Sequence, residues 1–209
     1  MTSSDLITFI VAMIIMMNPL GSLSIFLQLT KRFTHTEQRK TAITSSIAMT
    51  IIMVVTVWIG DAFLDLLGIT IPSFRFAGGI ILLLMGLSML QSKESPVSHT
   101  SADDEAAKGR ESIAVVPLAL PVIIGPGAIS TLIIYTGDYP QFFPKVWMSF
   151  TCLILALGMG LILFFAHPVA KFVGESVIKV VTRIMGMIIM AIAVGMLADG
   201  LTGLLPALR

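Results

Sequence analysis

The sequence is poor in charge and has almost no cysteine. Lysine, arginine, aspartate and glutamate make up 12% of its 209 residues, whereas a soluble domain has about 25%. The formal net charge is only +1, so no basic surface for nucleic acid is expected. A single cysteine, Cys152, excludes a disulfide framework and a cysteine-based metal cluster. We expect neither a cofactor nor a bound metal ion.

Apolar residues take the place of the missing charge. They make up 56% of the chain, and its mean hydropathy is +0.98. A water-soluble globule of this composition would expose far more apolar surface than such proteins tolerate. The sequence therefore predicts an all-α integral membrane protein whose main partner is the lipid bilayer.

Six stretches are long and apolar enough to be considered as membrane-crossing helices, which need about 20 residues because lipid offers the backbone no hydrogen bonds. They are Leu6–Leu29, Thr41–Leu67, Phe76–Leu90, Ile113–Tyr135, Val146–Ala166 and Ile184–Leu205. We predict a polytopic protein with six transmembrane helices that form a single domain over residues 1–209.

Basic residues gather on one side of the predicted helices. The first, third and fifth connections carry Lys31, Arg32, Arg39, Lys40, Lys93, Lys108, Arg110, Lys171 and Lys179. The other side has only Arg75, Lys145 and Arg209. Because positive connections stay in the cytoplasm, this bias predicts that both termini lie outside. The longest connection, about residues 92–112, is predicted to be a cytoplasmic linker between residues 5–91 and 113–206.

These two halves share a proline and an arginine at nearly the same spacing. Pro19 precedes Arg75 by 56 residues, and Pro126 precedes Arg183 by 57 residues. Since each half has three predicted crossings, an odd number, the second half would be inserted upside down relative to the first. Such inverted repeats are typical of secondary transporters. A duplicated scaffold with no transport role is the alternative.

The first helix of each half contains proline and glycine at a corresponding position. Proline removes a donor from a helix interior and disfavours helical geometry in the residue before it. We predict that each helix stops and restarts, with Asn18 and Gly125 as N-caps. A restarted helix presents free N–H groups and attracts carboxylates. The candidate substrate-binding residues are Asn18, Pro19, Gly21, Ser22, Gly125, Pro126, Gly127 and Ser130.

Carbonyl groups at the end of each preceding half-helix can hold a cation or an ammonium group. The helix N-termini and these carbonyls would give the site opposite partial charges, with no formally charged side chain. Such a site suits a small zwitterion, such as a neutral amino acid, better than a strongly charged solute. The alternative is a pair of proline kinks whose freed carbonyls are satisfied by neighbouring helices.

Few charges lie within or near the predicted helices. We expect Arg75 to pair with Asp61 or Asp65 across a short hairpin. In the second half, Arg183 and Glu175 would form the matching pair, and the two pairs would act as gates on opposite faces. Simple anchoring of helix ends at the interface is the alternative. Asp199, within the last helix, is the candidate site for a coupling ion.

The sequence offers little for other classes of membrane protein. It lacks the His-Glu-x-x-His motif of metalloproteases and paired aspartates deep in facing helices, so we do not expect an enzyme. A channel is a further alternative because helix breaks also build selectivity filters. The sequence leaves open whether the chain forms a homo-oligomer.

Five segments together resemble the MarC family of bacterial and archaeal membrane proteins, and most closely its YchE-like branch. They are Met17-Asn18-Pro19-Leu20-Gly21, Phe74-Arg75-Phe76-Ala77-Gly78-Gly79-Ile80, Val116-Pro117-Leu118-Ala119-Leu120-Pro121, Gly125-Pro126-Gly127-Ala128-Ile129-Ser130 and Thr182-Arg183-Ile184-Met185-Gly186. Each segment alone is weak evidence, but their combination is specific and covers nearly the whole chain.

The resemblance implies a six-helix protein of the prokaryotic plasma (inner) membrane, related to the LysE transporter superfamily. Archaeal relatives are described as carriers of glycine and alanine that use a cation gradient. The resemblance places Asn18, Pro19, Gly21, Gly125, Pro126 and Gly127 in the family's motifs. We therefore predict a secondary transporter of small neutral amino acids, coupled to Na⁺ or H⁺.

Overall fold

The computed structural model describes residues 2–91, 114, 118–119 and 123–205, and all regular structure among them is helical. The helices are α1 (Ser3–Met17), α2 (Pro19–Leu29), α3 (His35–Leu66), α4 (Ile71–Gln91), α6 (Pro126–Asp138), α7 (Phe142–Phe164), α8 (Ala166–Val173) and α9 (Glu175–Leu204). The predicted all-α class is thus confirmed for the described residues. The predicted linker, about residues 92–112, lies outside them.

Five helical segments are long and apolar enough to cross a membrane: Ser3–Leu29 (α1 with α2), His35–Leu66, Ile71–Gln91, Phe142–Phe164 and Ser176–Leu204. They correspond to the first, second, third, fifth and sixth predicted stretches. Of the fourth stretch, the structure describes mainly α6, which has 13 residues and is too short to cross alone. The six crossings and the inverted repeat remain predictions.

The helices differ from the predicted stretches mainly at their ends. The third helix begins at Ile71 and not at Phe76, and the last one begins at Glu175 and not at Ile184. The second begins at His35, because Thr34 and Glu37 form a capping box in the polar residues before the apolar run. Hydropathy finds the apolar part of a helix, so first turns that contain charged residues are missed.

The fifth stretch is also divided. Helix α7 ends at Phe164, and the separate helix α8 follows after Phe165. Helix α8 is short and ends at Gly174, whose φ of 79° lies in the left-handed region that favours glycine.

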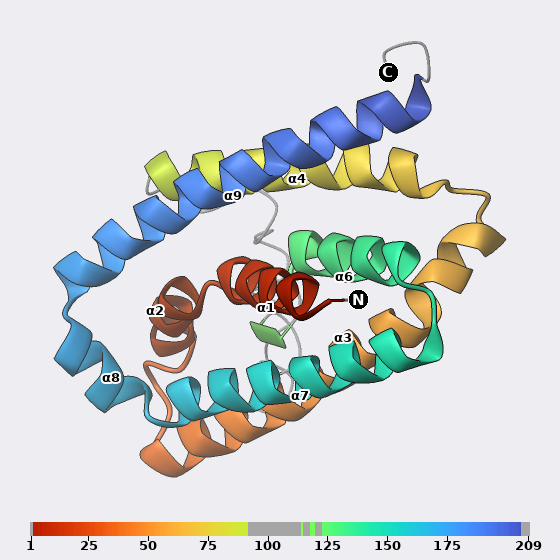
Figure 1. Cartoon of the computed structure of the whole chain (residues 1–209). Helices are drawn as coiled ribbons and strands as arrows, with labels where there is room; N and C mark the ends of the chain where they lie inside the picture. The colour runs from red at the N-terminus through yellow and green to blue at the C-terminus, as the bar shows by residue number, and fades with distance from the viewer. Residues whose placement is uncertain (1, 92–113, 115–117, 120–122, 206–209) are drawn as a thin grey trace.

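Two long helix pairs lie at opposite sides of the molecule, α4 with α9 and α3 with α7, and α1, α2 and α6 lie between them (Figure 1). The α4–α9 pair is antiparallel, since Pro72 lies against Gly203 and Gly86 lies against Gly186 and Met190. Glycines allow the two backbones to approach, as is common between membrane helices.

The α3–α7 pair is also antiparallel. Near one end, the Arg39 guanidinium lies 4.9 Å from the centroid of the Phe164 ring. Near the other end, the Trp58 indole N–H donates to the Ser149 hydroxyl at 3.0 Å. Between them, the Ser46 hydroxyl donates to a carbonyl of α7, and so polar groups inside the pair are satisfied by each other.

Candidate functional site

The first predicted break lies between α1 and α2 and has the predicted form. Asn18 adopts the left-handed conformation, with φ 44° and ψ 68°, and so ends α1. Its side-chain Oδ1 accepts from the Gly21 N–H at 3.3 Å, and Pro19 is the first residue of α2. Asparagine is one of the few residues other than glycine that tolerate this conformation. The helix therefore stops and restarts, which is more than a proline kink.

The second predicted break has the same outline with a different cap. Gly125 is extended, with φ −76° and ψ 175°, and Pro126 is the first residue of α6. Glycine has no side chain to cap the helix, and the Gly125 carbonyl accepts from the N–H groups of Ala128 and Ile129. Both predicted N-caps are thus confirmed as helix starts.

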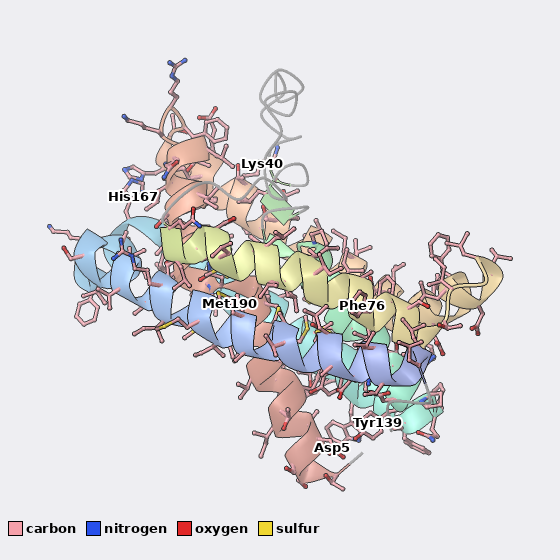
Figure 2. All side chains as sticks on the ribbon, turned by 90° about the horizontal axis from the view of Figure 1, so that it is seen from above. Asp5, Lys40, Phe76, Tyr139, His167 and Met190 are labelled. Atoms are coloured by element: carbon pink, nitrogen blue, oxygen red, sulfur yellow. The ribbon has the colours of Figure 1, made fainter. Side chains whose placement is uncertain are left out.

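Antiparallel packing of α1 against α6 brings the two breaks together. The Phe9 and Tyr135 rings lie 5.1 Å apart, and the Tyr139 phenol lies near the Asp5 carboxylate. Partial burial raises the pKa of the Tyr139 phenol, and the neighbouring Asp5 carboxylate acts in the same direction. Figure 2 shows Asp5 and Tyr139 side by side at one end of the molecule, with His167 and Lys40 toward the other.

At the broken ends, Gly127 lies beside the last turn of α1. A Cβ added to Gly127 would come within 3.6 Å of the Met16 sulfur and 2.3 Å of the Leu82 Cδ2. The C-terminus of α1 and the N-termini of α2 and α6 therefore meet inside the molecule. Met16, Ile124 and Ala128 are buried there, so the three helix ends act in apolar surroundings.

Unused backbone donors remain at these helix starts. The N–H groups of Leu20 and Gly127 make no hydrogen bond to any described residue, because an α-helix leaves its first N–H groups without internal partners. On the α1 side, the Met17 carbonyl accepts from the Ser22 hydroxyl at 2.8 Å. The arrangement offers two anion-attracting helix N-termini next to one cation-attracting C-terminus.

The other candidate residues at the breaks are small or hydroxylated for visible reasons. A Cβ at Gly21 would lie 2.1 Å from the Asn18 amide nitrogen, so only glycine leaves room for the cap. Ser130 is buried and lies against Gly78 of α4. Ser22 and Ser130 thus place two hydroxyls among the apolar side chains near the helix starts.

The predicted partners of Arg75 are wrong. Arg75 pairs with Asp138 at 2.8 Å, and both Asp138 carboxylate oxygens accept from its Nη2. It does not pair with Asp61 or Asp65, because the α3–α4 turn does not bring its side chain to them, whereas α6 ends beside α4. Asp199 of α9 lies 3.9 Å from the Arg75 Nη1.

Hydropathy and spacing gave no reason to select Asp138, because it is 63 residues from Arg75. The only signal in the sequence was its position just after the fourth predicted stretch, on the same predicted side of the membrane as Arg75. The Asp199 side chain is 68% exposed, so it lies near the molecular surface. The Glu175 side chain lies outside the described residues, and the predicted pair with Arg183 is untested.

Known proteins resemble this chain over nearly its whole length. The protein family described as "MarC family integral membrane protein" matches residues 3–205. The UPF0056 membrane protein YhcE of Escherichia coli is 32% identical over 200 residues, which cover 96% of this chain and 93% of that protein.

Two further relatives come from other prokaryotes. A UPF0056 membrane protein of Buchnera aphidicola is 33% identical and covers 97% of this chain and 94% of its own length. One from Pyrococcus horikoshii is 34% identical and covers 89% of each. No solved structure matches the chain. The full-length match and these identities show that the chain belongs to the MarC family of integral membrane proteins.

Proposed function

We propose that the protein is a secondary transporter of small neutral amino acids across the plasma (inner) membrane of a prokaryote. The observation that carries this proposal is the meeting of three helix ends inside the molecule, at α1, α2 and α6. Broken helices whose ends converge near the middle of a membrane protein are a recurrent way to build a solute site.

The electrostatics favour a zwitterion. Each helix N-terminus carries the equivalent of about half a positive charge, and each C-terminus about half a negative charge. The starts of α2 and α6 would together balance one carboxylate, with the Leu20 and Gly127 N–H groups as donors. The Met16 and Met17 carbonyls at the end of α1 would accept from an ammonium group. Buried methionines and isoleucines around the site leave little space for a large or charged side chain.

The inverted repeat is part of the proposal. In it, α1 with α2 corresponds to the segment that ends in α6, α3 to α7, and α4 to α9. Antiparallel α3–α7 and α4–α9 pairs support this relation, because a two-fold axis in the membrane plane would place corresponding helices side by side in opposite directions. A sixth crossing would then include residues before α6.

We assign Arg75 and Asp138 to a latch at one end of the proposed pathway. The pair joins α4 of the first half to α6 of the second, so its release would let the halves separate there. The Arg75 Nε is buried without a hydrogen-bond partner within the described residues. Asp199, 3.9 Å from the same guanidinium, is the candidate for coupling to Na⁺ or H⁺.

Flux through reconstituted vesicles tests the proposal. Purified protein in proteoliposomes is expected to take up labelled glycine and alanine saturably, and an inward gradient of Na⁺ or of protons should increase the rate. Gly127→Leu should abolish uptake, because the new side chain would occupy the space beside Met16 and Leu82. Gly158→Leu is the matched control, since nothing lies within 4 Å of a Cβ at Gly158.

The other outcomes separate the alternatives. Uptake no faster than in protein-free vesicles, under either gradient, would contradict transport of these amino acids. Flux that rises linearly with concentration and shows no exchange would identify a channel. Equal saturable uptake by wild type and Gly127→Leu would place the solute site elsewhere.

A further inference from the structure

A second polar region lies far from the broken helices, at the end of the molecule where α3 begins and α7 meets α8. An open cavity of about 380 Å³ is lined there by the first two turns of α3 and by residues 163–168. Its lining includes His35 and Arg39 from α3, and Phe164, Phe165 and His167 from the α7–α8 corner. Figure 2 shows His167 at this end, away from Asp5 and Tyr139.

Each polar side chain of this cavity carries at least one N–H donor, and none of them is a carboxylate. The His35 and His167 rings lie 5.4 Å apart in an edge-on arrangement, and the Arg39 guanidinium lies over the Phe164 ring. No carboxylate of the described residues forms an ion pair with Arg39. The Glu37 carboxylate accepts from the backbone N–H and hydroxyl of Thr34. The cavity thus has an arginine and two imidazoles available for an anion.

A metal ion fits this cavity less well. Within the part of the chain that the structure describes, no group of three histidine, cysteine, aspartate or glutamate side chains is close enough to bind one. The amide nitrogen of Gln38, the remaining polar side chain of the lining, already donates to the Thr30 carbonyl at 3.0 Å. A planar, multidentate donor such as arginine is suited to a phosphate group.

Apolar surface continues directly from the cavity. Ile43 and Ile47 follow Arg39 at four-residue spacing, so they lie on the same side of α3, and both are more than half exposed. On the antiparallel α7, Leu161 and Leu157 run in the same direction away from the cavity and are also more than half exposed. An anion held at Arg39 would therefore have two apolar tracks beside it.

Helix α8 marks this end as a membrane–water interface. It is eight residues long, and its sequence AHPVAKFV places apolar and polar residues on different faces. Phe172 is 94% exposed, and Lys171 is exposed next to it. A short amphipathic helix with an exposed aromatic ring and a lysine is typical of a segment that lies in the headgroup layer.

We infer that this cavity binds the phosphate of an anionic phospholipid, whose acyl chains lie along α3 and α7. Arg39 holds the phosphate by charge-assisted hydrogen bonds, and His35 and His167 donate further N–H groups. This assignment depends only on the protein's being embedded in a bilayer, so it stands or falls apart from the proposed transport. Basic pockets at the cytoplasmic ends of membrane helices are suited to such headgroups.

Lipid titration of the delipidated full-length protein in detergent tests the assignment. Bound phosphatidylglycerol is counted by native mass spectrometry, with phosphatidylcholine and inorganic phosphate as separate arms. The wild type should bind phosphatidylglycerol in preference to phosphatidylcholine. The double variant Arg39→Gln/His167→Gln should lose about tenfold in apparent affinity, the size expected for charge-assisted hydrogen bonds. Arg39→Lys, which keeps the charge, should recover part of that loss.

Lys145→Gln is the matched control, because it removes one positive charge at the opposite end of α7 and should leave the affinity unchanged. Equal affinities of wild type and double variant would overturn the assignment, as would equal binding of phosphatidylcholine. Competition by inorganic phosphate as strong as that of the lipid would show a site for free phosphate and would also overturn it. Thermal unfolding of each variant without added lipid separates loss of binding from loss of folding.

Discussion

At the scale of single residues, Asn18 performs two tasks. Its backbone takes the left-handed conformation that ends α1, and its side chain caps α2 through the Gly21 N–H. Most residues with a Cβ pay about 1–2 kcal/mol for that conformation. The sequence motif Asn18-Pro19-Leu20-Gly21 thus encodes the break by three separate effects: the conformation of asparagine, the missing donor of proline and the open space at glycine.

Substitutions at Asn18 separate these effects. Asn18→Ala removes the cap and strains the backbone, so we expect it to lower the free energy of unfolding by about 2 kcal/mol. Asn18→Gly removes only the cap and should cost a few tenths, roughly 0.3 kcal/mol. Reversible unfolding in mixed micelles measures both. Equal losses would mean that the left-handed conformation is not formed in the membrane.

At the scale of helices, close packing of α4 on α9 depends on glycines that face the partner. A Cβ added at Gly86 would lie 2.8 Å from the Gly186 carbonyl oxygen, a backbone atom that cannot move alone. By contrast, a Cβ added at Gly195, which lies on α9, meets nothing within 4 Å. The two positions differ in contact and not in residue type.

We therefore expect opposite effects from one kind of substitution. Gly86→Ala should destabilise the protein by about 1–3 kcal/mol, the usual range for overpacking. Gly195→Ala should be neutral or stabilise it by up to about 1 kcal/mol, because alanine favours a helix over glycine. Thermal unfolding in detergent compares the variants. A loss of stability of the same size at both positions would contradict the close α4–α9 packing.

The Arg75–Asp138 pair is the second contact between helices that can be tested. Asp138→Asn should lower the free energy of unfolding by about 1 kcal/mol, a modest value because the Asp138 side chain is 49% exposed. Asp65→Asn is the control, since no ion pair with Asp65 is described. Chemical unfolding at low and high salt should show the difference shrinking as salt increases. A larger effect of Asp65→Asn would favour the pairing expected from sequence.

At the scale of the whole molecule, the sequence allowed prediction of where helices break but not of which breaks meet. Proline and glycine fix Asn18 and Gly125 as caps through local geometry. The position of Gly127 beside Met16 depends instead on how α1 packs on α6, and no local pattern contains that information. For the same reason the sequence did not indicate Asp138 as the partner of Arg75. Asp61 and Asp65 were predicted as partners only because they are close to Arg75 along the chain.

Orientation in the membrane is a separate prediction at this scale. Lys171→Cys should react with a membrane-impermeant maleimide only from the cytoplasmic side, and Ser4→Cys only from the outside, as the distribution of basic residues predicts. Both positions are exposed, and native Cys152 is fully buried, so it should contribute little background. Labelling of intact and opened cells measures the sidedness. The reverse pattern, or labelling of both positions from one side, would contradict the predicted topology.

In the proposed transporter, backbone dipoles at three converging helix ends bind both charges of one small solute. Equilibrium binding of labelled glycine to the purified protein, with competing compounds that lack one charge, tests this binding mode. We expect unlabelled glycine and alanine to displace the label, while methylamine, acetate and glycine methyl ester compete at least about tenfold more weakly. Saturable glycine binding that methylamine or acetate displaces as well as glycine does, or no glycine binding at all, would contradict the claim.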